Sequence, residues 1–167
     1  MSESRDFEIS VVDSKVRDSL VPILEESFEG IYLRHSKRTL RESELVKVAR
    51  VGGENAGLVM LKELGRGIGY IYYIAVSRKH RRQGIAGKLL DNSLEYFIGK
   101  GNIEAYASVE VDNDESMNLF LSRGFKETKF GEVSKRHGHI SATLLYTKMW
   151  VVPGERVYVK DLTPKLQ

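Results

Sequence analysis

The 167-residue sequence contains no cysteine. This absence excludes disulfide bonds, thiolate metal sites and any mechanism that uses a covalent cysteine intermediate. The sequence also has little net charge, because 26 basic residues are nearly balanced by 23 acidic ones, which leaves +3. So small an excess argues against a protein dedicated to nucleic-acid binding. Any basic site must therefore be local.

Long apolar runs are missing as well. The longest, YIYYIAV at residues 70–76, is far shorter than the ~20 residues that span a membrane. The first ten residues are polar and lack the apolar segment of a signal peptide. We therefore expect a cytoplasmic protein with no membrane partner. The length predicts a single domain over residues 1–150 and a C-terminal extension at 151–167.

The hydrophobic periodicity predicts an α/β (α+β) fold. Strands are expected at residues 7–13, 45–51, 56–64, 69–76, 103–111, 125–133 and 140–152, and 156–162 could add a short one. Helices are expected within residues 16–24, 36–45, 85–99 and 114–124, whereas 27–35 and 134–139 are expected to be a loop and a turn. Antiparallel hairpins followed by a strand–helix–strand crossover predict a mixed, mostly antiparallel sheet with helices on both faces.

A cluster of positive charge precedes the helix expected from residue 85. Four basic residues between 78 and 82 come just before Gly84, and Gly87 lies in the first helical turn. The start of a helix presents unpaired N–H groups, and glycine lets a phosphate approach them. Neither the Walker spacing nor GxGxxG is present. The alternatives are a basic loop in which glycine only permits a tight turn, and a nucleic-acid site, which the lack of a stacking aromatic disfavours.

Two blocks of this chain resemble the GCN5-related N-acetyltransferase (GNAT) superfamily. Arg81-x-x-Gly84-x-Ala86 resembles its acetyl-CoA signature. Residues 109–125 resemble its second block, in which an asparagine follows a strand and a short helix closes on Gly-Phe. The remainder matches only in the order of its elements. The resemblance implies a GNAT fold, with a splay between the fourth and fifth strands, and points toward the protein N-terminal acetyltransferases.

The same resemblance implies how acetyl-CoA would bind. Amides of residues 82–87 would hold the pyrophosphate, and the main chain of 74–76 would bond the pantetheine arm. Asn113 would bond the pantetheine side, or serve as a plain helix cap, or both. The cofactor-binding residues implied are Ile74, Ala75, Val76, Arg81, Arg82, Gln83, Gly84, Ile85, Ala86, Gly87, Asn113 and Phe120.

Acetyl transfer to an amine requires the amine to be neutral, so a base is useful. Without cysteine, direct attack in a ternary complex is the natural route. Tyr70, working through a water, is the first candidate base and Glu110 the second. The ordinary alternatives are a half-buried strand aromatic for Tyr70 and a solvated edge charge for Glu110. Phe120 stands where the family usually has a tyrosine that protonates the leaving thiolate, so that step would need water, another residue or no acid.

Family members usually build the acceptor site from the loop between the first two helices and the turn between the last two strands. By that resemblance the turn supplies His137 and His139, for which exposed turn residues are the alternative. HxH is also a weak metal motif, but no third ligand is evident, so no metal is expected. The substrate-binding residues predicted are Phe28, Glu29, Tyr32, Tyr72, Ser108, His137 and His139.

We therefore expect an N-acetyltransferase that acts on a protein N-terminal α-amine or a lysine. A small-molecule acetyltransferase, for example one that acts on polyamines, is the alternative acceptor class. Because of Phe120, a non-catalytic CoA-binding module is a second alternative. Neither nucleic acid nor a metal is expected as a partner, and whether C-terminal strands pair two copies into a homodimer is left open.

Overall fold

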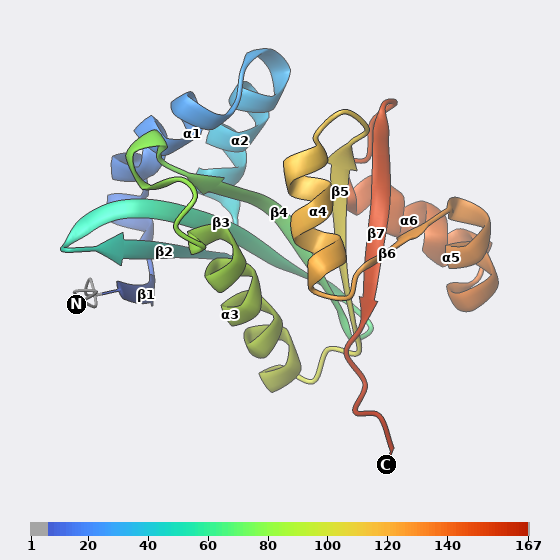
Figure 1. Ribbon diagram of the computed structural model, residues 1–167. Coiled ribbons are helices and arrows are strands. Elements are labelled where there is room, and N and C mark those ends of the chain that lie inside the picture. The colour runs from blue at the N-terminus through green and yellow to red at the C-terminus, as the bar shows by residue number, and fades with distance from the viewer. Residues whose placement is uncertain (1–6, 167) are drawn as a thin grey trace. The chain divides into compact units, whose positions relative to one another are not determined.

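The computed structural model describes residues 7–166, so residues 1–6 of the polar N-terminal stretch lie outside the described residues. In chain order the elements are β1 (Phe7–Val11), the 3-10 helix η1 (Ser14–Leu20), α1 (Val21–Ser27), α2 (Gly30–Glu42), β2 (Leu45–Val51), β3 (Glu54–Gly65), β4 (Ile68–Val76), the 3-10 helix η2 (Arg78–His80), α3 (Ile85–Gly99), β5 (Glu104–Glu110), α4 (Asp114–Ser122), β6 (Lys126–Thr128), α5 (Phe130–His137), α6 (His139–Met149) and β7 (Glu155–Asp161). Figure 1 shows their arrangement. Among the described residues, no helix is both long enough and apolar enough to cross a membrane.

The strands form one mixed sheet in the order β1-β2-β3-β4-β5-β7-β6. β4 and β5 run parallel, whereas β1–β2, β2–β3, β5–β7 and β6–β7 are antiparallel. The predicted mixed, mostly antiparallel sheet is therefore confirmed. The short strand expected near 156–162 is β7, which lies between β5 and β6. The predicted domain boundary at residue 150 stays a prediction.

The chain divides into two compact units, and β3, β4 and α3 each have residues in both. The first unit contains residues up to 62 and residues 72–93. Val48 of β2 and Leu58 of β3 share a buried cluster with Leu24 of α1 and Leu40 of α2. Because side chains alternate along a strand, Lys47 points to the other face, where its Nζ donates to Asn92 of α3 at 2.7 Å. Helices thus cover both faces of this part of the sheet, as predicted.

The second unit contains residues 63–71 and 94–167. Tyr70 lies opposite Tyr106 in the parallel pair, and its hydroxyl reaches the carbonyl of Met149 in α6. The neighbouring Gly69 points away from α6, toward Phe97 in the last turns of α3. An added Cβ at Gly69 would lie 2.5 Å from that ring, so only glycine fits there. Figure 1 shows α4 on the face of β5 and β7 opposite to α6.

The strands expected at 125–133 and 140–152 are wrong, apart from β6. Residues 130–149 instead form two helices, α5 and α6, joined at Gly138, whose φ of 87° suits glycine. The β-branched and aromatic side chains in this segment favour strands locally. Tertiary packing overrides that preference, because Ala142, Leu145 and Met149 recur at helical spacing and are buried. The Glu132 carboxylate also accepts the N–H of Lys129 at the start of α5.

The loop expected at residues 27–35 is also wrong over most of its length. α2 begins at Gly30, so only the two residues between α1 and α2, Phe28 and Glu29, are extended. Both have β-region backbone angles, and Gly30 follows with a φ of 54°. We call residues 27–30 the α1–α2 junction. Tyr32 consequently lies on a helix and not in a loop.

Candidate active site

The segment between β4 and α3, in the first unit, has the form of an anion-binding loop. Arg82 and Gly84 have positive φ values of 59° and 76°, and α3 begins directly afterwards. The first helical bond runs from the Lys88 N–H to the Gly84 carbonyl at 3.1 Å. Within the described part of the chain, the N–H groups of residues 82–87 have no protein acceptor. A Cβ built on Gly84 would meet nothing within 4 Å, so the space above these amides is open.

Several hydrogen bonds hold this loop in place. The Ser77 N–H donates to the Ala56 carbonyl of β3 at 2.9 Å. The Ser77 hydroxyl lies 2.8 Å from Nδ1 of the buried His80. Arg81 donates from Nε to the Val76 carbonyl at 3.2 Å and from Nη2 to the Glu26 carbonyl at 2.9 Å. The loop is therefore organised by the protein itself, without a ligand.

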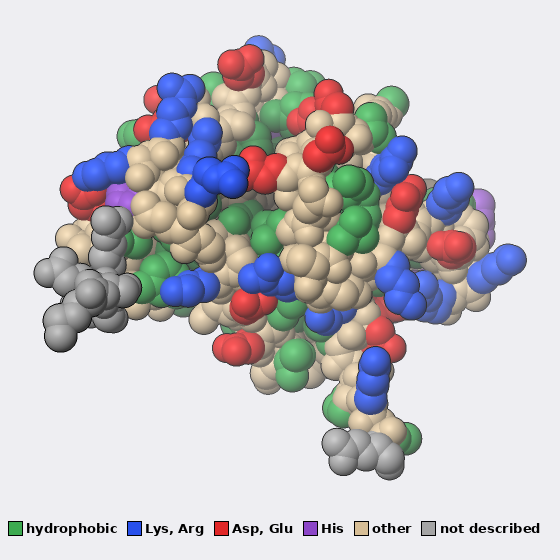
Figure 2. All heavy atoms as spheres, in the orientation of Figure 1, with side chains coloured by type: hydrophobic (Ala, Val, Ile, Leu, Met, Phe, Trp, Pro, Cys, Tyr) green, Lys and Arg blue, Asp and Glu red, His purple; other side chains and the backbone are tan. Residues whose placement is uncertain are grey.

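The four basic residues of this loop do not have equal roles. Lys79 forms an ion pair with Glu54 at 2.7 Å, and this hydrogen bond lowers the pKa of the Glu54 carboxyl. The Arg81 guanidinium donates to the carbonyls of Val76 and Glu26. The side chains of Arg78 and Arg82 have no partner among residues 7–166. Figure 2 shows Lys and Arg side chains gathered over the β4–α3 segment. Two of the four positive charges are thus available to an anion.

Gly57 of β3 provides the surface on which the start of α3 packs. A Cβ at this position would lie 3.0 Å from the Ala75 carbonyl, 3.1 Å from Ile85 and 3.2 Å from Leu89. Because these contacts are as tight as a side chain tolerates, the missing side chain sets how close α3 approaches the sheet. Sequence reasoning missed Gly57, which carries no motif and has no positive φ.

The backbone pairing of β4 with β5 is short. It covers only Ile68–Ile71 with Glu104–Ala107. Ser108, Val109 and Glu110 continue to pair with β7 on their other side. The parallel ladder therefore ends at Ile71 and Ala107, and the family resemblance implied a splay between these two strands. Ile74, Ala75 and Val76, whose main chain was predicted to bind the cofactor, lie on β4 beyond this point.

In the second unit, Tyr70 and Ser108 form a hydroxyl pair. Tyr70 is only 2% exposed, and its OH donates to the Met149 carbonyl at 3.0 Å. The two hydroxyl oxygens of Tyr70 and Ser108 are 2.8 Å apart. Since the phenol proton goes to Met149, Ser108 must donate its own proton to the Tyr70 oxygen. The Tyr70 hydroxyl is therefore fixed in place as a hydrogen-bond donor to Met149.

Glu110 ends β5, two residues beyond Ser108 and on the same face of the strand. Its side chain is partly exposed. Burial, followed by the nearby Asp112 carboxylate, raises the pKa of Glu110 above that of an ordinary glutamate. A carboxylate with a raised pKa binds a proton more strongly, which is what a general base requires.

Asn113 caps α4, because its Oδ1 accepts the Ser116 N–H at 3.1 Å. The NH₂ group of Asn113 has no protein partner among residues 7–166, so capping does not prevent it from contacting a ligand. Phe120 is buried in α4 and packs edge-on against Phe125, with ring centroids 5.1 Å apart. No phenolic proton is present at that position.

The residues predicted to bind an acceptor are divided between the two units. In the first, Phe28 packs edge-on against Tyr73 at 5.1 Å, Glu29 precedes α2, and burial raises the pKa of Tyr72. In the second, His137 and His139 flank Gly138 between two helices, not in a turn between strands. His137 lies 2.7 Å from the buried carboxylate of Glu104, and the ring of His139 packs against Phe130.

Sequence reasoning also missed His35 in the first unit. Its Nδ1 lies 2.7 Å from the hydroxyl of Tyr73. Burial, followed by the charge of Arg38, lowers the pKa of His35, which favours the neutral ring. The hydrogen bond between His35 and Tyr73 fixes the Tyr73 ring, against which Phe28 packs. Helical spacing alone could not have shown that His35 faces β4.

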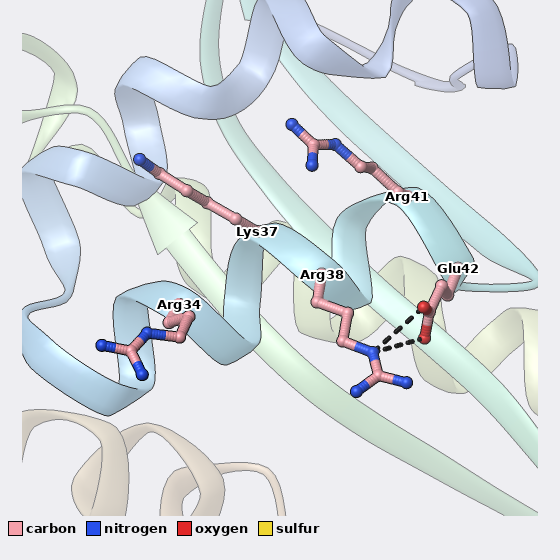
Figure 3. A pocket seen from close by; sticks show the side chains of 5 residues that line it. All are labelled: Arg34, Lys37, Arg38, Arg41 and Glu42. Atoms are coloured by element: carbon pink, nitrogen blue, oxygen red, sulfur yellow. Dashed lines mark hydrogen bonds and ion pairs between the residues drawn. The ribbon is translucent and has the colours of Figure 1, made fainter.

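A hollow of about 390 Å³ lies along α2, lined by Arg34, Lys37, Arg38, Arg41 and Glu42 (Figure 3). Acidic groups already partner three of its cations. Lys37 pairs with Glu25 at 2.7 Å, Arg38 with Glu42 at 3.0 Å, and Arg41 with Asp18 at 3.3 Å. An anion entering the hollow must compete with these partners, so we assign it no ligand.

Residues 15–125 match the sequence profile of the "Acetyltransferase (GNAT) family". An N-alpha-acetyltransferase of Sulfurisphaera tokodaii is 36% identical over 94 residues, which are 49% of this chain and 56% of that protein. N-alpha-acetyltransferase 30 of Schizosaccharomyces pombe is 39% identical over 57 residues, 34% of this chain and 38% of that protein. The chain thus spans about half of these curated relatives or less.

Solved structures agree with the fold. Ard1 from Thermoplasma volcanium superposes with a TM-score of 0.71 at 19% identity, covering 95% of this chain and 99% of that one. The NatC complex, solved with Gag peptide and CoA, contains a chain with a TM-score of 0.69 at 19% identity, covering 95% and 99%. At this level of identity the likeness concerns the fold alone.

Proposed function

Because the chain belongs to the acetyltransferase (GNAT) family, we propose that it moves the acetyl group of acetyl-CoA to a primary amine. We further propose that the acceptor is a protein N-terminal α-amine or a lysine, attacked directly in a ternary complex. Similarity to proteins named N-alpha-acetyltransferases supports the α-amine. The partly exposed carboxylate of Glu110, with its raised pKa, is the single observation that carries the catalytic assignment.

The residues of the anion-binding loop fit the diphosphate of CoA. The amides of residues 82–87 have no protein acceptor, and Gly84 leaves the space above them open. The side chains of Arg78 and Arg82 add positive field, which is modest after screening at an exposed site. Asn113 keeps its NH₂ group for the pantetheine side. When bound, acetyl-CoA supplies the activated acetyl thioester.

The contacts of the two predicted bases favour Glu110 over Tyr70. Tyr70 already donates its proton to a backbone carbonyl, and ionising it would place a phenolate against that oxygen. We therefore give Tyr70 of β4 and Ser108 of β5 a positioning role, because their hydrogen bond joins the two strands. Glu110 accepts a proton from the ammonium form of the acceptor, directly or through water, which leaves the neutral amine that attacks. Phe120 cannot protonate the leaving thiolate, so this step is left to water.

The test is an acceptor panel read by release of the CoA thiol. It contains peptides with a free N-terminus and no lysine, Nα-acetylated peptides with one lysine, and polyamines. We expect turnover on the first two classes, with the free N-terminus preferred. Turnover on polyamines alone would replace the protein acceptor with a small amine. Binding of CoA without turnover on any member would overturn the enzyme assignment and leave a CoA-binding module.

A matched pair of variants tests the base. Glu110→Gln keeps the shape of the side chain and removes its basicity, and we expect turnover to fall by about 10²–10⁴. Asp112→Asn, two residues away, removes the same charge without removing the proposed base. An equal effect of both variants would reduce Glu110 to a charge in the local field.

A further inference from the structure

Glu26 joins the anion-binding loop to the α1–α2 junction. Its carboxylate accepts the Arg78 N–H at 2.6 Å, and its main-chain carbonyl accepts Nη2 of Arg81 at 2.9 Å. All three residues lie in the first unit. We propose that Glu26 and Arg81 couple the two segments, so that a diphosphate ligand on the amides of residues 82–87 positions Phe28 and Glu29 for the acceptor. The inference rests on the proposed function, because it assigns the junction to the acceptor site.

Within the α1–α2 junction, Phe28 is packed whereas Glu29 and Gly30 have few contacts. The Phe28 N–H closes α1 on the Leu24 carbonyl at 2.9 Å, and the Phe28 ring rests on Tyr73. Glu29 is exposed and extended, and Gly30 has a positive φ with nothing within 4 Å of a built Cβ. Phe28 also packs against the buried cluster of the first unit. Glu29 and Gly30 lack such packing, so their position depends on the residues that anchor the junction. Glu26, two residues before Phe28, is the anchor that leads to the anion-binding loop.

Arg81 is suited to this connection by its shape. Its guanidinium donates to Val76 at the end of β4 and to Glu26 at the end of α1, two acceptors that a single ammonium group cannot match in the same planar arrangement. Arg78 N–H and the amides of residues 82–87 belong to the same short segment. A ligand that immobilises those amides therefore also immobilises the partners of Glu26.

The consequence is reciprocal. If a diphosphate ligand improves acceptor binding by some factor, the acceptor improves binding of that ligand by the same factor. In the unmodified chain we expect CoA to raise the affinity for an acceptor peptide by about 5-fold or more, within the usual range of coupling. Removing the Glu26 side chain removes its hydrogen bond with the Arg78 N–H. The ratio of peptide affinities with and without CoA should then approach one, while CoA alone still binds.

The experiment compares Glu26→Ala with Glu25→Ala in the full chain. Glu25 is the adjacent residue of α1, is also exposed, and pairs only with Lys37 among the described residues. Hydrogen exchange of residues 24–33 is followed with and without CoA, and peptide affinity is measured by calorimetry in both states. Both variants change exposed side chains, so folding should be preserved. Glu26→Gln keeps an acceptor for the Arg78 N–H and should restore part of the coupling.

We expect CoA to slow hydrogen exchange of residues 24–33 in the unmodified chain and in Glu25→Ala. In Glu26→Ala, CoA should not slow it. Equal protection in all three proteins, or none in the unmodified chain although CoA binds, would overturn the coupling. Failure of the unmodified chain to bind CoA would instead overturn the proposed function. The two failures are therefore distinguishable.

Discussion

The hydroxyl of Tyr70 donates a hydrogen bond to the main-chain carbonyl of Met149, 79 residues further along the chain, at 3.0 Å. This bond connects the parallel β4–β5 pair with the last residue of α6. Ser108 completes the arrangement by donating to the Tyr70 oxygen. A tyrosine predicted from the sequence as a base is thus held as a donor by a helix that the sequence did not reveal.

Tyr70→Phe should lower both stability and turnover. It leaves a buried carbonyl without its donor, and we expect a loss of about 1–3 kcal/mol in the free energy of unfolding. Turnover should fall because Ser108 loses its acceptor, while CoA affinity should be unchanged, since the anion-binding loop is not altered. Denaturant unfolding, kinetics and calorimetry measure the three quantities. Tyr146→Phe, which keeps the ring contact with Phe130, is the control, and an equal loss there would remove Tyr70 from the positioning role.

The pH dependence of activity should report Glu110. A base must be ionised to accept a proton, so kcat/KM should fall as the pH drops through the raised pKa of Glu110. This limb should disappear in Glu110→Gln. An acid limb of the same position and steepness in that variant would assign it to a different group.

Glu110→Gln should lower turnover but raise the free energy of unfolding. A carboxyl whose pKa is raised by folding binds its proton more tightly in the folded chain, so its ionised form opposes folding. Glu110→Gln should therefore stabilise the chain slightly at neutral pH, and this gain should fade as the pH falls toward and below the raised pKa. Paired urea titrations at neutral and acid pH measure the difference. A loss of stability at neutral pH would contradict the assigned direction of the pKa shift.

The local signals of the sequence predicted the parts of the fold that depend on them. Alternating apolar residues gave β1 to β5 close to their observed bounds, and a glycine after basic residues marked the start of α3. The strand prediction for residues 130–149 was wrong because their β-branched and aromatic content favours strands, whereas the burial of Ala142 and Leu145 stabilises a helix. The helical spacing of Ala142, Leu145 and Met149 is present in the sequence, but only the folded chain shows that these are the side chains that become buried.

The candidate site shows the same limit. The loop around Gly84 and the cap at Asn113 were predictable, since both rest on local backbone chemistry. Glu26, Gly57 and His35 were not, because each acts through a residue distant in the chain. The residue types themselves carry no sign of the partner, which only the folded chain supplies.

Gly84→Glu should abolish CoA binding. The substitution places a carboxylate in the open space above the amides of residues 82–87 and forces a side chain onto a φ of 76°. Gly53→Glu is the matched control, because Gly53 has a φ of 80° and the same open surroundings in the turn between β2 and β3. Both variants should lose similar stability, and only the first should lose CoA binding by calorimetry. Unchanged affinity in Gly84→Glu would refute the placement of the diphosphate.

Gly57→Ala should weaken CoA binding from a distance. Its Cβ would press on the Ala75 carbonyl, Ile85 and Leu89, so the start of α3 must shift by a few tenths of an ångström. We expect a loss of about 1–3 kcal/mol in stability from overpacking, together with a raised KM for acetyl-CoA. Gly99→Ala, at the other end of α3 with nothing within 4 Å, should leave both nearly unchanged. Equal KM values in the two variants would show that the amides tolerate the shift.

Glu104→Gln should loosen the α5–α6 hairpin. The side chain of Glu104 is only 8% exposed, and it binds Arg136 and His137 at the end of α5. Tyr106 donates to the same carboxylate, and burial, followed by the charge of Glu104, raises the pKa of Tyr106. Removing the charge leaves the half-exposed Arg136 and the partly buried His137 with a neutral amide oxygen in place of a carboxylate, so we expect faster hydrogen exchange across residues 130–149 and a lower free energy of unfolding.

The matched control is Glu127→Gln, which removes an exposed carboxylate 3.7 Å from Arg156 on the same sheet. An exposed pair of this kind contributes about 0–1 kcal/mol, so its loss should be small and should leave the hairpin protected. The Met149 carbonyl at the end of α6 accepts the hydrogen bond of the Tyr70 hydroxyl. A loosened hairpin should therefore disturb Tyr70, and Glu104→Gln should reduce turnover more than CoA affinity. Faster hydrogen exchange in the hairpin without any change in kcat would show that Glu104 contributes to stability only and not to turnover.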